Sequence, residues 1–313
     1  MRHRVLIQSG SLLPALEARL VAQYDTAQLP PAGPARDSFL AARGAEFEGL
    51  ATSARFGADA ALMAALPGLR VISSFGVGLD KLDLDAARAR GIAVGYTPDV
   101  LNDCVADTAF LLLMDVARRG SAADRFVRRG DWLQGQFPIT SQVSGKRLGI
   151  FGMGRIGRVI ARRSVGFDME VRYHNRRPLA DVDYAYAASL KELAQWADFL
   201  VIASAGGAET RGLVSREILD ALGPQGYLVN ISRGTVVDEA ALVDALVHQR
   251  IAGAGLDVFE HEPKVPSALL ALDNVVLFPH VASNTAETRA AMAQRVEDNL
   301  TAFFANKPLV SAA

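Results

Sequence analysis

The 313-residue sequence has one cysteine, almost no net charge and no long apolar run. A single thiol excludes an internal disulfide and a cysteine-rich metal site, and the apolar periodicity around Cys104 predicts a buried helical position for it. The net charge of −1 gives no overall attraction for nucleic acid or an anionic membrane. Because the apolar runs are too short for a signal peptide or a membrane span, we expect a cytoplasmic globular protein.

Strands and helices alternate along the chain. Short apolar runs alternate with helical patterns over residues 5–96, which is typical of βαβ units and a parallel sheet. Within this part, the proline- and glycine-rich stretch at 28–37 predicts a surface connection. A second alternation, with strands predicted between residues 146 and 280, has the form of two mononucleotide-binding halves. The sequence therefore predicts an α/β protein of two domains.

Two longer helices are predicted outside these alternations. The helix at 99–119 has a broad apolar face, which fits burial in the core as well as packing against another domain or subunit. The helix at 284–307 has Asn284 or Thr285 as its N-cap, followed by Glu287. It is long enough to return to the first domain.

The stretch GMGRIG at 152–157 lies between a predicted strand and a predicted helix, with another strand following. In such a unit Gly152 permits a tight turn, Gly154 lets the backbone approach a pyrophosphate, and Gly157 allows close packing of helix and strand. The helix N-terminus adds free N–H groups and a positive dipole end. This context predicts a dinucleotide-binding site.

The end of the next strand indicates which dinucleotide is bound. NAD sites carry Asp or Glu there, about 20 residues after the glycines, to bind the ribose 2′-OH. This sequence has Asn175, Arg176 and Arg177 instead. Guanidinium groups bind a 2′-phosphate, which a carboxylate would repel. We therefore expect a preference for NADP(H), with NAD(H) as an alternative cofactor.

Three polar residues each follow a predicted strand: Arg233, Glu262 and His280. The carboxyl ends of strands in a doubly wound sheet form the ligand-binding edge. Each residue alone also fits a solvated loop position. Together they provide a cation for a substrate carboxylate, a proton donor, and a carboxylate that orients the donor.

Four stretches in this order, GMGRIG, NISRGTVVDEAALVDAL, GAGLDVFEHEP and LFPHVASNTAETRAAM, resemble the signatures of D-isomer-specific 2-hydroxyacid dehydrogenases. LRVISSFGVGLDKLDLDAARARGIAV resembles that family's substrate-domain signature, so the resemblance covers essentially the whole chain. GDWLQGQFPIT and YHNRRP are similar to the glyoxylate/hydroxypyruvate and hydroxyphenylpyruvate reductase branch. The resemblance implies a flavodoxin-like substrate-binding domain (1–97 with 285–313), a Rossmann domain for NAD(P) (98–284), and an active site in the cleft between them.

The resemblance also implies roles for individual residues. Arg233 would bind the carboxylate and carbonyl of a 2-keto acid, His280 would be the acid/base, and Glu262 would orient it. Substrate binding would further involve the backbone N–H groups of Val77 and Gly78, and Trp132, in its own or a partner subunit's site; Trp132 also fits a structural surface aromatic. The expected cofactor-binding residues are Gly152, Met153, Gly154, Arg155, Ile156, Gly157, Asn175, Arg176, Arg177, Ser204, Ala205, Ile231, Asp257 near the carboxamide, His280 and Ser283.

One loop departs from the family pattern. ASAGGAET stands where a proline and Thr-x-Glu are usual, which predicts a more open contact with the adenine ribose. We expect no metal, no nucleic acid or membrane partner, a 2-keto or 2-hydroxy acid as substrate, and a homodimer built on the helix after Pro98. The alternatives are a dinucleotide-sensing, corepressor-like binding protein, or a dehydrogenase for another acid such as phosphoglycerate. Glyoxylate, hydroxypyruvate and arylpyruvates all stay open as substrates.

Overall fold

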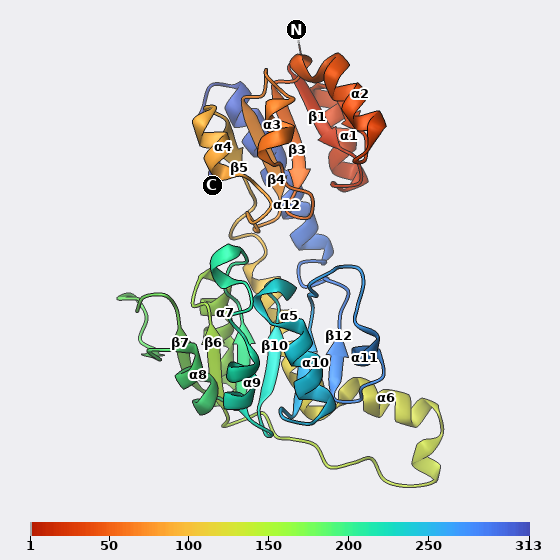
Figure 1. Ribbon diagram of the computed structural model, residues 1–313, viewed down its shortest axis with the longest axis vertical. Helices are drawn as coiled ribbons and strands as arrows, with labels where there is room; N and C mark the ends of the chain where they lie inside the picture. The colour runs from red at the N-terminus through yellow and green to blue at the C-terminus, as the bar shows by residue number, and fades with distance from the viewer. Residues whose placement is uncertain (1) are drawn as a thin grey trace. The chain divides into compact units, whose positions relative to one another are not determined.

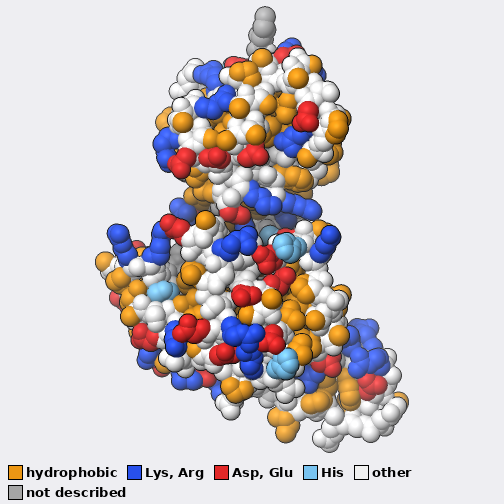
Figure 2. Space-filling model, viewed as in Figure 1, with side chains coloured by type: hydrophobic (Ala, Val, Ile, Leu, Met, Phe, Trp, Pro, Cys, Tyr) orange, Lys and Arg blue, Asp and Glu red, His pale blue; other side chains and the backbone are white. Residues whose placement is uncertain are grey.

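Two units make up the described chain, residues 2–313 of the computed structural model (Figure 1). Unit 1 comprises Met1–Leu101 and Thr285–Ala313, and unit 2 comprises Asn102–Asn284. Each unit has its own parallel sheet and its own hydrophobic core. Basic and acidic side chains are interspersed over the visible face of both units, so neither shows a face of one charge there (Figure 2).

Unit 1 contains a five-stranded parallel sheet in the order β2-β1-β3-β4-β5, which is the flavodoxin-like order. Helices α1 and α12 cover one face, where Ser73 Oγ donates a hydrogen bond to the carbonyl of Val296. Helices α3 and α4 contribute to the core on the other face. The elements are β1 (Arg4–Gln8), α1 (Pro14–Gln23), β2 (Asp25–Leu29), α2 (Pro34–Arg43), η1 (Gly44–Glu46), β3 (Gly49–Ser53), α3 (Ala60–Ala64), β4 (Val71–Phe75), α4 (Leu84–Ala89), β5 (Ala93–Gly95) and α12 (Ala286–Phe304).

Unit 2 contains a seven-stranded parallel sheet in the order β12-β11-β10-β9-β6-β7-β8. Read from β8 to β11 this is the Rossmann order 3-2-1-4-5-6, with the glycine-rich loop following the central strand β6. Its elements are α5 (Asn102–Arg118), α6 (Gly120–Arg128), η2 (Asp131–Leu133), β6 (Arg147–Phe151), α7 (Arg155–Ser164), η3 (Val165–Phe167), β7 (Glu170–His174), β8 (Ala185–Tyr186), α8 (Leu190–Trp196), β9 (Phe199–Ile202), η4 (Ala208–Thr210), α9 (Arg216–Leu222), β10 (Tyr227–Asn230), η5 (Gly234–Val236), α10 (Glu239–Val247), β11 (Gly253–Leu256), α11 (Ser267–Leu270) and β12 (Val275–Leu277).

Helices cover both faces of the seven-stranded sheet. Helices α8, α9 and α10 pack their apolar side chains into one core cluster. Helix α5 contacts β10, β11 and β12, and a Cβ on Gly255 would lie 2.9 Å from the Cβ of Leu112. The apolar face of α5 is therefore buried in the core of its own unit, which is one of the two alternatives expected for it.

Four elements are not predicted from the sequence, because few of their side chains are buried. The edge strand β2 has one fully buried residue, Leu29, and β8 is only two residues long. Helices α2 and α6 have no fully buried residue. Since α2 begins at Pro34, the expectation of a surface connection over 28–37 is wrong for the end of that stretch.

Two local expectations are settled by side-chain contacts. Thr285 rather than Asn284 caps α12, because its hydroxyl accepts a hydrogen bond from the N–H of Thr288. Cys104 is only partly buried, which corrects the expectation of a buried position, and its Sγ donates to the carbonyl of Ala282.

Candidate active site

The glycine-rich loop between β6 and α7 has a shape that its glycines require. Gly152 has a φ of +104°, and a Cβ there would collide with the backbone of Ser204. A Cβ on Gly157 would collide with the carbonyl oxygen of Gly152. A Cβ on Gly154 would meet no atom within 4 Å. Gly152 and Gly157 are therefore required by close contacts within the protein, whereas Gly154 borders open space at the start of α7.

Asn175, at the end of β7, holds this loop in place. Its side-chain oxygen accepts a hydrogen bond of 2.7 Å from the N–H of Met153, and the N–H of Gly152 donates to the carbonyl of His174 at 3.0 Å. The first turn of α7 then presents N–H groups that have no acceptor within the helix. A small open space beside N–H groups at the positive end of a helix fits the pyrophosphate of a dinucleotide.

His280 and Glu262 lie together at the carboxyl edge of the same sheet. His280 follows β12 and Glu262 follows β11, and His280 Nδ1 is 2.8 Å from Glu262 Oε2. The other oxygen of Glu262 accepts the N–H of Phe259 at 3.1 Å. Because an ionised carboxylate only accepts hydrogen bonds, this contact assigns a proton to Nδ1 and directs Nε2 away from Glu262.

The positive charge of Arg233 acts on the carboxylate of Glu262. Burial raises the pKa of Glu262, but the hydrogen bond and charge of His280, the N–H of Phe259 and the charge of Arg233 together lower that pKa below its ordinary value. Glu262 is therefore a carboxylate at neutral pH. The three residues picked out in the sequence share one electrostatic neighbourhood, although 47 positions separate Arg233 from His280.

A buried carboxylate fixes the loop that carries His280. Asp257 has no exposed surface, and its two oxygens accept the N–H groups of Val281 and Ala282 at 2.7 and 3.0 Å. Its carbonyl accepts the N–H of His280, whose φ is +54°. Burial raises the pKa of Asp257, and the two N–H donors oppose that rise. The sequence linked Asp257 to the cofactor, whereas its contacts in the structure are with the His280 loop.

Four more predicted cofactor residues lie at this edge, after β9, β10 and β12. Ser204 and Ala205 follow β9, and the Oγ of Ser204 is buried without a hydrogen-bond partner among the described residues. Ile231 is buried after β10, and Ser283 is partly buried beyond His280. A buried, unpaired hydroxyl next to the glycine-rich loop is a group that a bound dinucleotide can satisfy.

The two arginines after β7 have different surroundings. Arg176 Nη1 lies 2.5 Å from Glu209 Oε2, and both side chains are largely exposed. Arg177 is exposed and has no ion pair or hydrogen bond within residues 2–313. The sequence did not single out Glu209. The only hint of this region in the sequence is that ASAGGAET departs from the family pattern, and that departure predicts only a more open loop.

The predicted substrate residues belong to three different segments of the two units. In unit 1, the loop after β4 is fixed by paired hydrogen bonds between Gly76 and Thr97, which leaves Val77 and Gly78 partly exposed beyond it. In unit 2, Arg233 is at the sheet edge, whereas Trp132 lies in η2 and is 67% exposed. Helix α6, which precedes η2, projects from the body of its unit (Figure 1).

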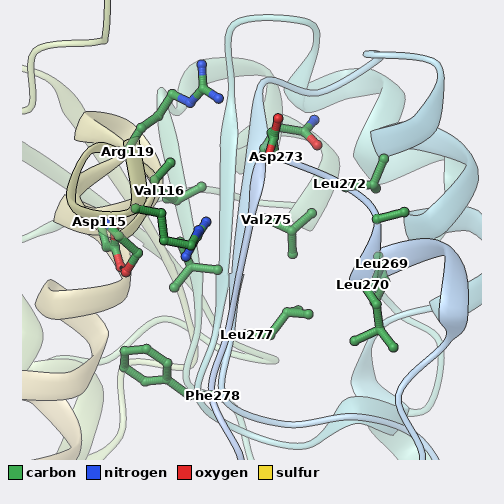
Figure 3. A pocket seen from close by; sticks show the side chains of 16 residues that line it. Asp115, Val116, Arg119, Leu269, Leu270, Leu272, Asp273, Val275, Leu277 and Phe278 are labelled. Carbon is green, nitrogen blue, oxygen red and sulfur yellow. Dashed lines mark hydrogen bonds between the residues drawn. The ribbon is translucent and has the colours of Figure 1, made fainter. Parts of the chain in front are cut away.

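A cavity of about 350 Å³ lies elsewhere, at the outer edge of the seven-stranded sheet (Figure 3). Val275 and Leu277 of β12 lie between Val116 of α5 and the side chains of Leu269 and Leu270. The cavity includes none of the residues predicted for the site. Within residues 2–313, no group of three His, Cys, Asp or Glu side chains is arranged to hold a metal ion, and no helix has the length and apolarity needed to cross a bilayer.

Comparison with known proteins identifies the family. A family model described as the NAD-binding domain of D-isomer-specific 2-hydroxyacid dehydrogenases matches residues 110–282. The chain belongs to this family. Hydroxyphenylpyruvate reductase of Plectranthus scutellarioides is 49% identical over 278 residues, 89% of each chain. Glyoxylate/hydroxypyruvate reductase A of Arabidopsis thaliana is 49% identical over 259 residues, 83% of each chain.

A solved structure in this 2-hydroxyacid dehydrogenase family is similar over the whole chain. NADPH-dependent glyoxylate/hydroxypyruvate reductase of Sinorhizobium meliloti, in complex with NADP and malonate, is 41% identical with a TM-score of 0.93. The similarity covers 100% of this chain and 97% of that one. The family, the parallel α/β fold and the oxidoreductase class predicted from the sequence are confirmed.

Proposed function

We propose that this 2-hydroxyacid dehydrogenase reduces 2-keto acids to D-2-hydroxy acids, with NADP(H) preferred over NAD(H). The observation that carries the proposal is the grouping of Arg233, Glu262 and His280 at the carboxyl edge of the sheet whose central strand leads into the glycine-rich loop. The relatives that reduce glyoxylate, hydroxypyruvate and hydroxyphenylpyruvate support these acids as the substrate class.

The residues at the edge of the sheet divide the chemistry between them. Arg233 binds the substrate carboxylate and stabilises the negative charge that develops on the carbonyl oxygen. Protonated His280 donates its proton to that oxygen through Nε2, while Glu262 accepts the hydrogen bond from Nδ1 and fixes the orientation of the ring. In the reverse reaction His280 accepts the proton of the hydroxyl group. The nicotinamide, when bound, exchanges a hydride with C2 of the acid.

The cofactor is proposed to lie along the same edge. The N–H groups of 152–157 would hold the pyrophosphate, Arg176 and Arg177 the 2′-phosphate, and Ser204, Ala205, Ile231 and Ser283 the remaining polar groups. Asp257, which has no exposed surface, would act on the cofactor only through the loop that it fixes. The domains are proposed as 98–284 for NAD(P) and 1–97 with 285–313 for the substrate, where the N–H groups of Val77 and Gly78 would bind its carboxylate.

We also propose a cytoplasmic homodimer. Trp132, Leu133 and Ile139 are largely exposed in and after η2, and exposed apolar side chains close together in sequence are typical of a subunit interface. In such a dimer Trp132 would be available to line a partner's substrate pocket. The cytoplasm fits a chain whose only cysteine cannot form an internal disulfide.

A substrate panel tests the proposed function. Glyoxylate, hydroxypyruvate and hydroxyphenylpyruvate are each offered with NADPH and with NADH, and the loss of reduced nicotinamide is followed by absorbance. We expect turnover of at least one acid, faster with NADPH, and a product of D configuration by chiral chromatography. Binding of NADPH without turnover of any acid would contradict the proposal and favour the corepressor-like alternative.

A further inference from the structure

In NAD enzymes, a carboxylate at the end of the second Rossmann strand binds the ribose. The corresponding position here, at the end of β7, has no carboxylate. Asn175 occupies it, and its side-chain oxygen is already bound to the N–H of Met153 at 2.7 Å. Its carbonyl accepts a hydrogen bond from the hydroxyl of Tyr186 at 3.0 Å. Asn175 is therefore neutral and committed to the glycine-rich loop. A carboxylate for the 2′ position has to come from another part of the chain.

The structure brings such a carboxylate from the loop after β9. Glu209 Oε2 is 2.5 Å from Nη1 of Arg176, the residue next to Asn175. Because β6 lies between β7 and β9 in the sheet, the loops after β7 and β9 flank the glycine-rich loop on its two sides. The Arg176–Glu209 pair joins these two loops. A carboxylate thus stands near the place where the Rossmann fold recognises the adenosine ribose.

The backbone around Glu209 is fixed while its side chain is exposed. Thr210 Oγ1 donates to the carbonyl of Ala205 at 2.8 Å, and Arg211 pairs with Glu260 at 2.8 Å. The N–H of Gly212 donates to the carbonyl of Thr235 at 2.9 Å. The Glu209 side chain is 75% exposed and that of Arg176 is 85% exposed. A fixed backbone with an exposed carboxylate presents a charge that exchanges partners at little cost.

We propose that Glu209 sets the balance between the two cofactors. In the absence of a 2′-phosphate its carboxylate pairs with Arg176, and it accepts a hydrogen bond from the 2′-hydroxyl of NAD(H). A 2′-phosphate draws Arg176 away from Glu209 and is repelled by the carboxylate that remains, so Glu209 moderates the preference for NADP(H). This inference rests on the proposed binding of a nicotinamide dinucleotide and deepens it.

Two adenosine probes test the proposal without any turnover. Adenosine 2′,5′-bisphosphate and AMP differ in the 2′-phosphate, and calorimetry gives the dissociation constant of each for wild type and for Glu209→Gln. We expect the variant to bind the bisphosphate about three- to fivefold more tightly, because an exposed like charge contributes at most about 1 kcal/mol. AMP binding should stay the same or weaken, so the ratio of the two constants changes. The gain should shrink in 1 M salt, which screens exposed charges.

The control removes a carboxylate from an exposed ion pair outside this loop. Glu217→Gln breaks the contact with Lys191 and leaves Arg176, Glu209 and the contacts that fix their loops in place, so the ratio of the two constants should match wild type. An unchanged ratio in Glu209→Gln, or the same shift for both probes, would overturn the role of Glu209 alone. Failure of wild type to bind either probe would overturn the dinucleotide site and this inference with it.

Discussion

The two ends of the binding edge of unit 2 are held in opposite ways. At one end, His280 lies in a loop fixed by Asp257, which is fully buried and accepts two backbone N–H groups. At the other end, Arg176 is held by an ion pair with Glu209 in which both partners are exposed. Both ends belong to the same parallel sheet and lie after the carboxyl ends of its strands.

The difference suits two kinds of task. A buried polar group left without its partner costs about 1–3 kcal/mol, so Asp257 strongly favours one conformation of the His280 loop. An exposed ion pair is worth about 0–1 kcal/mol, so Arg176 can change partners cheaply. Proton transfer needs a fixed donor, whereas recognition of two related cofactors is helped by exchangeable contacts. The comparison predicts large effects of substitution at the His280 end and small, charge-dependent effects at the Arg176 end.

The largest effect is expected for His280→Gln. Glutamine keeps a polar side chain of similar length but cannot donate a proton as an acid. General acid catalysis contributes about 10²–10⁴-fold, so kcat for keto acid reduction should fall by about that factor. The dissociation constant of NADPH, measured by the fluorescence of the bound nicotinamide, should change little. Near wild-type turnover in this variant would remove His280 from the mechanism.

A smaller effect is expected for Asp257→Asn, which changes no group proposed to react. The amide nitrogen of Asn cannot accept a hydrogen bond, so the N–H of Val281 or that of Ala282 loses its partner. A cost of about 1–3 kcal/mol on the geometry of the His280 loop corresponds to a fall in kcat of about 5- to 150-fold. Asp181→Asn, at an exposed carboxylate paired with Arg158, serves as the control and should keep wild-type kcat.

Thermal unfolding at several pH values gives Asp257→Asn a second readout. Burial raises the pKa of Asp257 above its unfolded value, so the native state binds this proton more tightly than the unfolded chain does. Asp257 therefore contributes most to stability below its unfolded pKa, and the contribution falls as pH rises through the native pKa. The difference in Tm between wild type and variant should widen toward acid pH. A difference independent of pH would show that the pKa of Asp257 is the same in the folded and the unfolded protein.

The same contrast explains what the sequence could reveal. The GMGRIG loop was predictable because the positive φ of Gly152 and the close approach of Gly157 to Gly152 both arise within one βαβ unit. The pairing of His280 with Glu262 was predictable because parallel strands bring their carboxyl ends to one edge. The contacts of Asp257 and Glu209 were not, since each depends on which of several loops approaches it. Strand β2 and helix α2 were missed for a related reason: their side chains are mostly exposed, so they carry little apolar periodicity.

The smallest effects are expected at the arginines after β7. Arg176→Ala with Arg177→Ala should weaken NADPH binding about tenfold, because two exposed charge-assisted contacts to a phosphate are lost, and NADH binding should change much less.

The single variants sharpen the comparison. Arg177 has no ion pair to give up within residues 2–313, whereas Arg176 must leave Glu209, so Arg177→Ala should lose more NADPH affinity than Arg176→Ala. Fluorescence titration of the three variants measures this order. Equal losses for both cofactors would refute a 2′-phosphate site at these arginines, and the reverse order of the single variants would show that the Glu209 pair does not compete with the phosphate.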